Sequence, residues 1–283
     1  MADSGLLDPR TIRALADELD LRPSKQRGQN FVIDPNTVRR IVSLAGVRPG
    51  EVVLEVGPGL GSLTLGLLEA GASVTAVEIE SSLATRLART VAERLPDASD
   101  RLRVVEADAL RITELDPPPT RLVANLPYNI SVPVILHLLA EFPSIASGLV
   151  MVQLEVADRL VAPPGSKVYG TPSAKLAWYA SASRVGTVPA SVFWPVPNVE
   201  SGLVAFTRRE APSTVDRRTT FDVVDAAFGQ RRKMLRAALS GVFGSSAAAS
   251  AALEAAGIDP TLRGETLTIE QFASIVPHLP RAV

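Results

Sequence analysis

Short apolar runs rich in β-branched residues alternate with helical patterns through the first two-thirds of the chain. The runs predict strands at residues 52–56, 73–79, 102–106, 121–124 and 148–155, and the patterns predict helices at residues 8–19, 34–47, 62–69, 81–95 and 132–141. Strands that alternate with helices at this spacing are typical of a doubly wound parallel sheet. The sequence therefore predicts an α/β fold for this part of the chain.

The character of the sequence changes after residue 184. A proline- and aromatic-rich stretch is followed by a predicted strand near a sheet edge, and only helical patterns remain beyond residue 220. The strand is expected at 202–207 and the helices at 221–228, 230–239, 247–256 and 269–279. Charge changes as well, because residues 1–206 carry 19 Lys and Arg against 22 Asp and Glu, whereas residues 207–283 carry 10 against 8. We therefore predict two domains, at residues 1–207 and 208–283.

The inventory of reactive side chains excludes several kinds of chemistry. The chain has no cysteine and only two histidines, His137 and His278, which are far apart in sequence. This argues against disulfides, thiolate nucleophiles, Cys/His metal sites and Ser-His-Asp triads, and we predict no metal. No stretch approaches the roughly 20 apolar residues of a membrane span, and the N-terminus lacks the pattern of a secretory signal. We expect a cytoplasmic protein without membrane contact.

A glycine-rich turn, Gly57-Pro58-Gly59-Leu60-Gly61, follows the strand at 52–56. Such a turn lets the backbone approach a ligand closely, and NAD-, FAD- and S-adenosylmethionine-binding folds all use one. The G-x-G-x-G spacing, with Glu55 two residues before the first glycine, resembles the adenosylmethionine version. The role of Glu55 stays open between orienting the loop, holding the amino group of the donor and capping the strand.

Two carboxylates follow the next two strands. Glu78 closes the strand at 73–79, where an acidic group can accept hydrogen bonds from both ribose hydroxyls. Asp108 lies just after the strand at 102–106, where it can accept from the exocyclic amine of adenine. Either residue alone would be read as a surface carboxylate or a helix cap. Together with Gly57 and Gly59 they predict a binding site for S-adenosyl-L-methionine.

The tetrapeptide Asn125-Leu126-Pro127-Tyr128 comes directly after the strand at 121–124. The exocyclic amine of adenine is a poor nucleophile because its lone pair is delocalised into the ring. The side-chain carbonyl of Asn125, helped by a backbone carbonyl such as that of Leu126, can accept both amine hydrogens and localise the lone pair. Pro127 would fix that carbonyl, and Tyr128 would stack on an extruded base. In another context the tetrapeptide would be an ordinary turn, but here it predicts methylation of adenine.

These motifs and three others make the chain resemble the ribosomal RNA adenine N6,N6-dimethyltransferases, which modify two adjacent adenosines near the 3′ end of small-subunit ribosomal RNA. The further motifs are residues 28–34, 193–201 and 228–235, with Pro260, Arg263, Glu265 and Leu267 near the C-terminus, so that the resemblance covers about residues 24–280. It implies a Rossmann-like S-adenosylmethionine-dependent methyltransferase domain and a small all-α RNA-binding domain. It also implies dimethylation of 16S rRNA in an intermediate of small-subunit assembly, by a monomer with a role in ribosome biogenesis.

The resemblance also assigns residues. It implies that Asn30 and Val32 cover the cofactor and that Gly57, Glu78, Asp108 and Asn125 line its pocket. It implies that Tyr128 and Phe193 sandwich the target adenine and that Arg231, Arg232 and Lys233 face RNA. By charge alone, the basic cluster is equally well a solvated helix face. Phe31, in the motif at 28–34, is equally well an anchor in the hydrophobic core.

Three positions depart from the family pattern, and two further functions stay open. Arg27 stands where the family has an aromatic residue, Pro172 where it has leucine, and Trp178 where glutamine is common. These departures concern local RNA contacts and loop shape. The alternatives are a non-catalytic assembly or transcription cofactor on the same fold, and an enzyme that methylates large-subunit rRNA and confers macrolide resistance.

Overall fold

The computed structural model describes residues 5–21 and 30–280, and these residues divide into two compact units. The first unit holds the described residues up to Ala157 and Ser183–Arg208. The second holds Asp158–Ala182 and the described residues from Arg209 onward. Arg27 and the first two residues of the motif at 28–34 lie outside the described residues.

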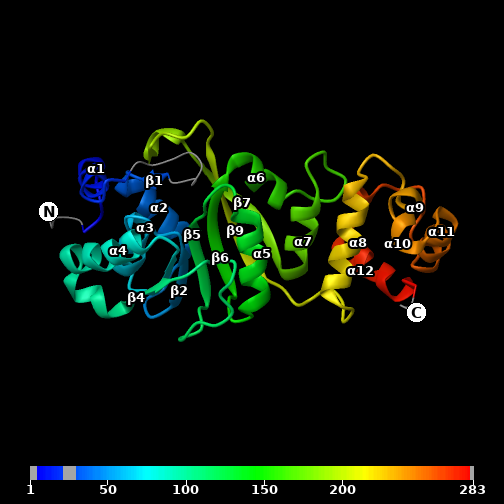
Figure 1. Cartoon of the computed structure of the whole chain (residues 1–283), viewed down its shortest axis with the longest axis horizontal. Coiled ribbons are helices and arrows are strands. Elements are labelled where there is room, and N and C mark those ends of the chain that lie inside the picture. Colours follow the sequence, from blue (N-terminus) through cyan, green and yellow to red (C-terminus); the bar gives the residue numbers. More distant parts are fainter. Residues whose placement is uncertain (1–4, 22–29, 281–283) are drawn as a thin grey trace. The chain divides into compact units, whose positions relative to one another are not determined.

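The first unit is built on a seven-stranded sheet with the strand order β4-β3-β2-β5-β6-β9-β7 (Figure 1). The strands are β2 (Val52–Val56), β3 (Ser73–Glu78), β4 (Leu102–Glu106), β5 (Arg121–Asn125), β6 (Ser147–Gln153), β7 (Ala180–Val188) and β9 (Ser201–Arg208). The five strands from β4 to β6 in this order are parallel, and β9 is antiparallel to β6. The predicted α/β fold is confirmed.

The helices of this unit are close to those predicted. They are α1 (Pro9–Glu18), α2 (Pro35–Ala45), α3 (Ser62–Glu69), α4 (Ser81–Arg94), the 3-10 helix η2 (Pro96–Arg101) and α5 (Ser131–Glu141), followed by α6 (Leu154–Leu160), which crosses into the second unit. The carboxylate of Asp34 accepts the N–H of Thr37 and caps α2. Gly46, at φ +61°, ends this helix two residues earlier than expected, because a left-handed glycine closes its last turn.

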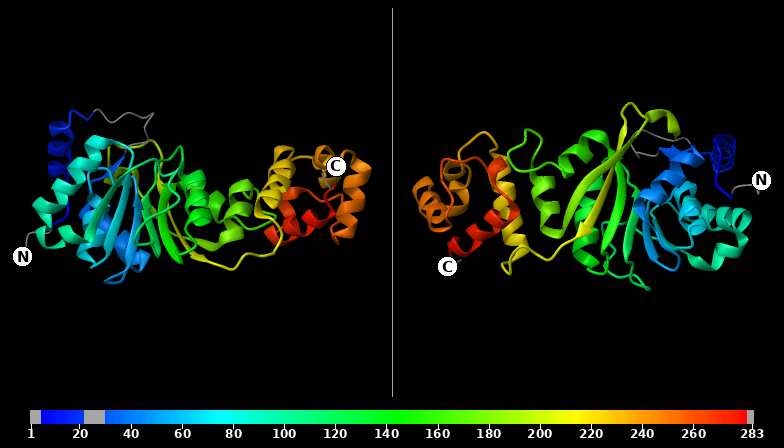
Figure 2. Two further views of the ribbon diagram at one scale, coloured as in Figure 1. Left: turned by 60° about the horizontal axis from the view of Figure 1, so that its bottom comes forward. Right: turned by 180° about the vertical axis from the view of Figure 1, so that it is seen from behind.

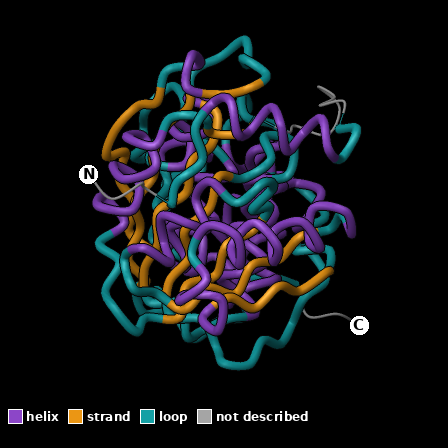
Figure 3. Tube along the Cα trace, turned by 90° about the vertical axis from the view of Figure 1, so that its left-hand side faces the viewer, coloured by secondary structure: helices purple, strands orange, loops and turns teal. Residues whose placement is uncertain are grey.

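The helices cover both faces of the sheet. α2 and α3 pack on each other, and α5 lies on the opposite face, which is nearer the viewer in Figure 1. The second panel of Figure 2 shows the sheet from behind, and Figure 3 gives the trace of the chain coloured by secondary structure, with helices in purple and strands in orange. The strand order reverses between β2 and β5, because β3 and β4 lie on one side of β2 whereas β6 lies beyond β5. In folds of this type, ligands bind at that reversal, beside the carboxyl ends of the strands.

A second sheet of two short strands joins distant parts of the first unit. β1 (Phe31–Val32) pairs antiparallel with β8 (Phe193–Trp194), and the rings of Phe31 and Trp194 stack with their centroids 6.3 Å apart. Phe31 is only 7% exposed and belongs to the hydrophobic core, as its reading as a core anchor expected. The sequence did not predict these strands, because two residues are too few to show a period.

The second unit consists mainly of short helices. They are α7 (Thr171–Tyr179), α8 (Arg217–Gly229), α9 (Leu235–Ala238), α10 (Ser240–Phe243), α11 (Ser246–Ala255) and α12 (Ile269–Ile275), with 3-10 turns at Gly264–Thr266 (η4) and Val276–His278 (η5). The predicted helix at 230–239 is wrong over its first half. The chain turns there, because the N–H groups of Leu235 and Arg236 donate to Leu262 and Pro260 rather than to an earlier helical turn.

The division between the units differs from the predicted boundary at 207/208 in one segment. Residues 158–182 belong to the second unit, because α7 packs against α8 and α12. The rings of Trp178 and Tyr179 both meet the ring of Phe221 edge-on, with centroids 6.0 and 6.1 Å apart. The predicted strand at 148–155 is also too long, because β6 ends at Gln153 and α6 begins at the next residue. No helix in the described part of the chain is long and apolar enough to span a membrane.

Candidate active site

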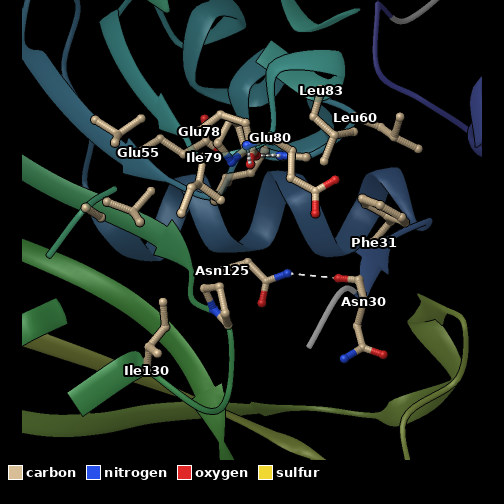
Figure 4. A pocket seen from close by; sticks show the side chains of 18 of the residues that line it. Asn30, Phe31, Glu55, Leu60, Glu78, Ile79, Glu80, Leu83, Asn125 and Ile130 are labelled. Carbon is tan, nitrogen blue, oxygen red and sulfur yellow. Dashed lines mark hydrogen bonds between the residues drawn. The ribbon is translucent and has the colours of Figure 1, made fainter. Parts of the chain in front are cut away.

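A cavity of about 310 Å³ opens at the carboxyl edge of the sheet in the first unit (Figure 4). Residues after four strands line it: the loop after β2, the end of β3, the turn after β4 and the end of β5. Among them are Gly57, Gly59, Glu78, Asp108, Asn125 and Pro127, together with Asn30 and Val32 from the segment around β1. The tertiary structure thus brings together all the residues that the sequence assigned to a cofactor.

The loop after β2 presents bare backbone to this cavity. Gly57, Gly59 and Gly61 have φ values of +65°, +56° and +98°, in the left-handed region that favours glycine. A Cβ atom at Gly59 would lie 2.7 Å from Cε1 of Phe31, and one at Gly61 would lie 2.8 Å from Cδ1 of Leu87. The turn therefore favours glycine at all three positions, and close packing also requires it at Gly59 and Gly61.

Glu78 is a buried acceptor at the end of β3. Its side chain is 5% exposed, and its two oxygens accept the N–H groups of Gly59 at 3.3 Å and Glu80 at 3.0 Å. Burial raises the pKa of this carboxyl, and the backbone N–H donors oppose that shift. Figure 4 shows Glu78 beside Ile79, an apolar residue of the same lining that is 66% exposed.

Asp108 follows β4 and is more open to solvent. Its side chain is 34% exposed, one oxygen accepts the N–H of Leu110 at 2.9 Å, and the other lies 3.6 Å from Arg111. The first of these contacts holds the carboxylate in place, while the solvated Arg111 adds little to it.

Asn125 is held by the segment that precedes β1. Its Nδ2 donates to the backbone carbonyl of Asn30 at 3.1 Å, and the two residues are 95 positions apart in sequence. Figure 4 shows the amide oxygen of Asn125 turned away from this contact. Ser62 fixes the same segment, because its Oγ donates to the carbonyl of Val32 at 2.7 Å. The carbonyl of Asn125 is therefore oriented by a backbone contact before any ligand binds.

Tyr128 and Phe193 do not occupy equivalent positions. Tyr128 is partly exposed, and its hydroxyl lies 2.8 Å from Oγ of Ser201. Phe193 has no exposed surface and belongs to the core. Phe193 thus lies in the core of the structure, on β8 where it pairs with β1, and its stacking on the target adenine stays a prediction. Leu126 is also buried, and its N–H donates to the carbonyl of Met151 at 3.1 Å.

Glu55 is the most deeply buried ionisable group of the cavity lining. It is 1% exposed, and Oγ1 of Thr64 donates to its carboxyl group at 2.6 Å. Burial, with a smaller contribution from the charge of Glu78, raises the pKa of Glu55 from 4.5 to about 8. Glu55 is therefore largely protonated at neutral pH, and it links β2 to α3 through Thr64.

We expect Glu55→Gln to flatten the pH dependence of stability. The folded pKa of about 8 lies above the ordinary value of 4.5, so the folded state keeps a proton that the unfolded state releases. The contribution of this carboxyl to the free energy of unfolding is then fully present below pH 4.5 and is lost as the pH rises to 8. Glutamine has no proton to lose, so the variant lacks this dependence. Between pH 5.5 and 8, the free energy of unfolding of the variant should therefore rise relative to that of wild type by on the order of 3 kcal/mol.

Urea unfolding at several pH values measures this difference. Glu69→Gln, an exposed substitution on α3, is the matched control and should follow wild type. If Glu55→Gln and wild type lose stability in parallel as the pH rises, the carboxyl of Glu55 is not protonated in the folded protein.

The basic cluster of the second unit divides into two kinds of residue. Arg231 donates to the carbonyl oxygens of Tyr169 and Lys167, the latter at 2.8 Å, and pairs with Glu265 at 2.9 Å. Arg232 and Lys233 are exposed. The structure thus places Arg231 in contacts within its own unit and leaves its two neighbours at the surface.

The lining of the cavity fits S-adenosylmethionine. Glu78 and Asp108 are acceptors for hydroxyl and amine donors, Ile79 offers an apolar face for a purine ring, and Gly57 and Gly59 line the cavity without side chains. The volume of about 310 Å³ is within the range of small-molecule sites. These features come from separate strands, as the reversal of strand order in such a fold requires.

Solved structures share this fold. A dimethyladenosine transferase from Plasmodium falciparum superposes with a TM-score of 0.73 at 23% identity, over 86% of this chain and 94% of that one. The 23S rRNA methyltransferase ErmE superposes with a TM-score of 0.63 at 27% identity, over 88% of this chain and 99% of that one.

Two proteins are similar to this chain in sequence over nearly its whole length. A protein of Cutibacterium acnes named ribosomal RNA small subunit methyltransferase A is 61% identical, over 100% of this chain and 97% of its own length. A protein of the same name from Thermobifida fusca is 63% identical, over 99% of this chain and 98% of its own length. The family profile described as ribosomal RNA adenine dimethylase matches residues 21–280. With its motifs, its fold and nearly its whole length accounted for, the chain belongs to the ribosomal RNA adenine dimethylase family of S-adenosylmethionine-dependent methyltransferases.

Proposed function

We propose that this chain transfers methyl groups from S-adenosylmethionine to the N6 amines of two adjacent adenosines near the 3′ end of 16S rRNA, within an intermediate of small-subunit assembly. The observation that carries the proposal is the position of Asn125-Leu126-Pro127-Tyr128. The tetrapeptide begins at the last residue of β5, at the cavity edge, with the amide of Asn125 oriented by Asn30. The names and high identities of the two bacterial relatives support small-subunit rRNA as the substrate.

When bound, S-adenosylmethionine supplies an electrophilic methyl group on a positively charged sulfur. The chain itself contributes orientation and hydrogen-bond acceptors. The carbonyl of Asn125, helped by the backbone carbonyl of Leu126, accepts the hydrogens of the target amine and localises its lone pair. Pro127 lines the cavity next to Asn125 and restricts the backbone at this point. The ring of Tyr128 holds the extruded base by stacking.

An enzyme is favoured over a non-catalytic assembly factor on the same fold. A pure binding protein has no need for a cofactor cavity beside an oriented acceptor. This chain has both the acidic residues of the cavity and the complete tetrapeptide. Methyl transfer from labelled S-adenosylmethionine to unmethylated small subunits tests the proposal. Incorporation into large-subunit RNA instead would identify the rival activity, which is the one that the name of ErmE describes for that protein.

We further propose that the protein acts as a monomer in the cytoplasm. In favour of a monomer, all the residues assigned to the cofactor line a single cavity of this chain. Sedimentation of the protein alone should give a mass near 29.9 kDa. A dimer at assay concentrations would contradict this part of the proposal.

The exposed part of the basic cluster is the proposed RNA contact. Arg232 and Lys233 are free to meet phosphates at the surface, whereas Arg231 already binds two backbone carbonyls and Glu265. We expect Arg232→Glu with Lys233→Glu to weaken RNA binding and to flatten its dependence on salt. The slope of log K against log salt should shrink by about 1.4 to 1.8, because two fewer counterions are released.

Binding titrations at several salt concentrations measure that slope. Arg231→Ala is the informative comparison, because it should lower the thermal stability of the second unit with little effect on the slope. A double variant with the wild-type slope would mean that Arg232 and Lys233 form a solvated face. If only Arg231→Ala changed the slope, the RNA contact would be made by Arg231 and not by Arg232 and Lys233.

A further inference from the structure

The hydroxyl of Tyr128 meets a buried serine. The two oxygen atoms, Oη of Tyr128 and Oγ of Ser201, lie 2.8 Å apart, although the residues are 73 positions apart in sequence. Ser201 has no exposed surface, and it is the last residue of the proline-rich motif that begins at Phe193. One hydrogen bond between side chains thus joins the tetrapeptide at 125–128, which contains Tyr128, to the motif at 193–201.

The backbone around Ser201 is held firmly. Ser201 begins β9 and lies opposite Gln153 of β6 in an antiparallel pair. Just before it, the carbonyl of Glu200 accepts the N–H of Leu154 at 3.0 Å. The serine hydroxyl is therefore a fixed point, since a paired strand supports its backbone and its burial removes rotational freedom.

Tyr128 is less constrained than its partner. It lies in the turn between β5 and α5 and is partly exposed. Burial of the hydroxyl end raises the pKa of the phenol, so that it stays protonated and can share a hydrogen bond with Ser201. A ring in a turn can rotate about two side-chain torsions, and a bond at its far end removes most of that freedom.

We propose that Ser201 is a positioning residue that fixes the orientation of the Tyr128 ring toward the target adenine. The inference rests on the proposed function, since it presumes that the Tyr128 ring stacks on the base. Stacking requires parallel planes at contact distance, and a ring that rotates freely spends only part of its time in that orientation. Ser201 touches neither substrate nor cofactor in this role, and it acts through Tyr128.

A double-mutant cycle tests the inference. Ser201→Ala and Tyr128→Phe each remove one side of the same hydrogen bond and keep the aromatic ring. Each should lower kcat/KM for small subunits about tenfold, the factor that corresponds to one hydrogen bond, with the KM for S-adenosylmethionine unchanged. The double variant should be no worse than either single variant, because the bond is lost only once.

A second measurement reports the ring without any reaction. The chain has three tyrosines, so that protein labelled with 3-fluorotyrosine should give three fluorine resonances. Tyr128→Phe assigns the resonance of Tyr128 by its disappearance. Ser201→Ala should shift this resonance and leave those of Tyr169 and Tyr179, which lie in the second unit, in place.

The matched control is Ser173→Ala, a buried serine of the second unit whose Oγ donates to the carbonyl of Arg159. It should leave kcat/KM and the Tyr128 resonance as in wild type. Additive losses in the double variant, or an unmoved Tyr128 resonance in Ser201→Ala, would overturn the inference while leaving the proposed function intact. Wild-type activity in Tyr128→Ala would instead refute the stacking role of Tyr128, and with it the premise of the inference.

Discussion

Asn125→Ala is expected to lower the turnover number for adenine methylation by a factor of about 10² to 10³, the usual cost of removing one preorganised acceptor from a transition state. The carbonyl of Asn30 orients the side chain of Asn125 in advance. The side-chain carbonyl of Asn125 therefore loses little conformational entropy when it accepts a hydrogen bond from the amine. Both methylations at each adenosine should suffer, because the monomethylated amine is presented through the same contacts with one hydrogen fewer. Mass spectrometry of dimethyladenosine in RNA from treated small subunits measures the loss.

The control for this substitution is Asn36→Ala, an exposed asparagine at the start of α2 that should leave turnover unchanged. Cofactor affinity of Asn125→Ala, measured by calorimetry, should remain close to wild type, since Glu78 and Asp108 are untouched. Near-wild-type amounts of dimethyladenosine from Asn125→Ala would refute the proposed role of this amide, even with fold and cofactor correct.

Glu78→Gln should weaken the binding of S-adenosylmethionine about 10- to 100-fold. A hydrogen bond to a charged group is worth about 1.5–3 kcal/mol, and glutamine replaces one carboxylate oxygen by a donor. Glutamine is chosen over alanine because it keeps one of the two oxygens that accept the N–H groups of Gly59 and Glu80, whereas alanine keeps neither. A shorter side chain would disturb the loop as well as the ligand contact. Calorimetric titration gives the dissociation constant directly.

The pH dependence of binding gives an independent check. Burial raises the pKa of Glu78, so the ionised acceptor is lost as the pH falls through that raised value. Affinity should therefore fall at a higher pH than the titration of an exposed glutamate would give, and Glu78→Gln should lack this dependence. Glu106→Gln is the matched control, because Glu106 lies opposite Glu78 on β4 but is exposed. Equal affinity in Glu78→Gln and wild type would contradict the ribose assignment.

Much of the site could be predicted from the sequence because its parts are local. Buried parallel strands are largely apolar, so β2, β3 and β5 could be recognised nearly to the residue. The carboxyl ends of parallel strands share one edge, and this predicts that Glu78, Asp108 and Asn125 lie together, as they do in the cavity lining. Glycines that must adopt positive φ are also visible in the sequence, as Gly57 and Gly59 illustrate.

Three features depended on contacts between distant residues. The strands β1 and β8 are too short to show a period, yet their pairing turns Phe193 into the core. Residues 158–182 carry no signal of a domain change, yet the rings of Trp178 and Tyr179 pack on Phe221 in the second unit. The guanidinium of Arg231 donates to the carbonyl of Tyr169, 62 positions away. Arg231 is therefore held within its unit, whereas Arg232 and Lys233 are exposed.

The sequence by itself therefore determined the α/β fold, and it predicted the cofactor edge and the chemistry of the tetrapeptide, because apolar periodicity, glycine conformation and residue type act over a few neighbouring residues. The tertiary structure alone decided which side chains are free to act. Asn125 is oriented by Asn30, Tyr128 meets Ser201, and Phe193 is enclosed. Each of these depends on residues dozens of positions apart, and only the packed sheet brings such residues within hydrogen-bond or van der Waals distance.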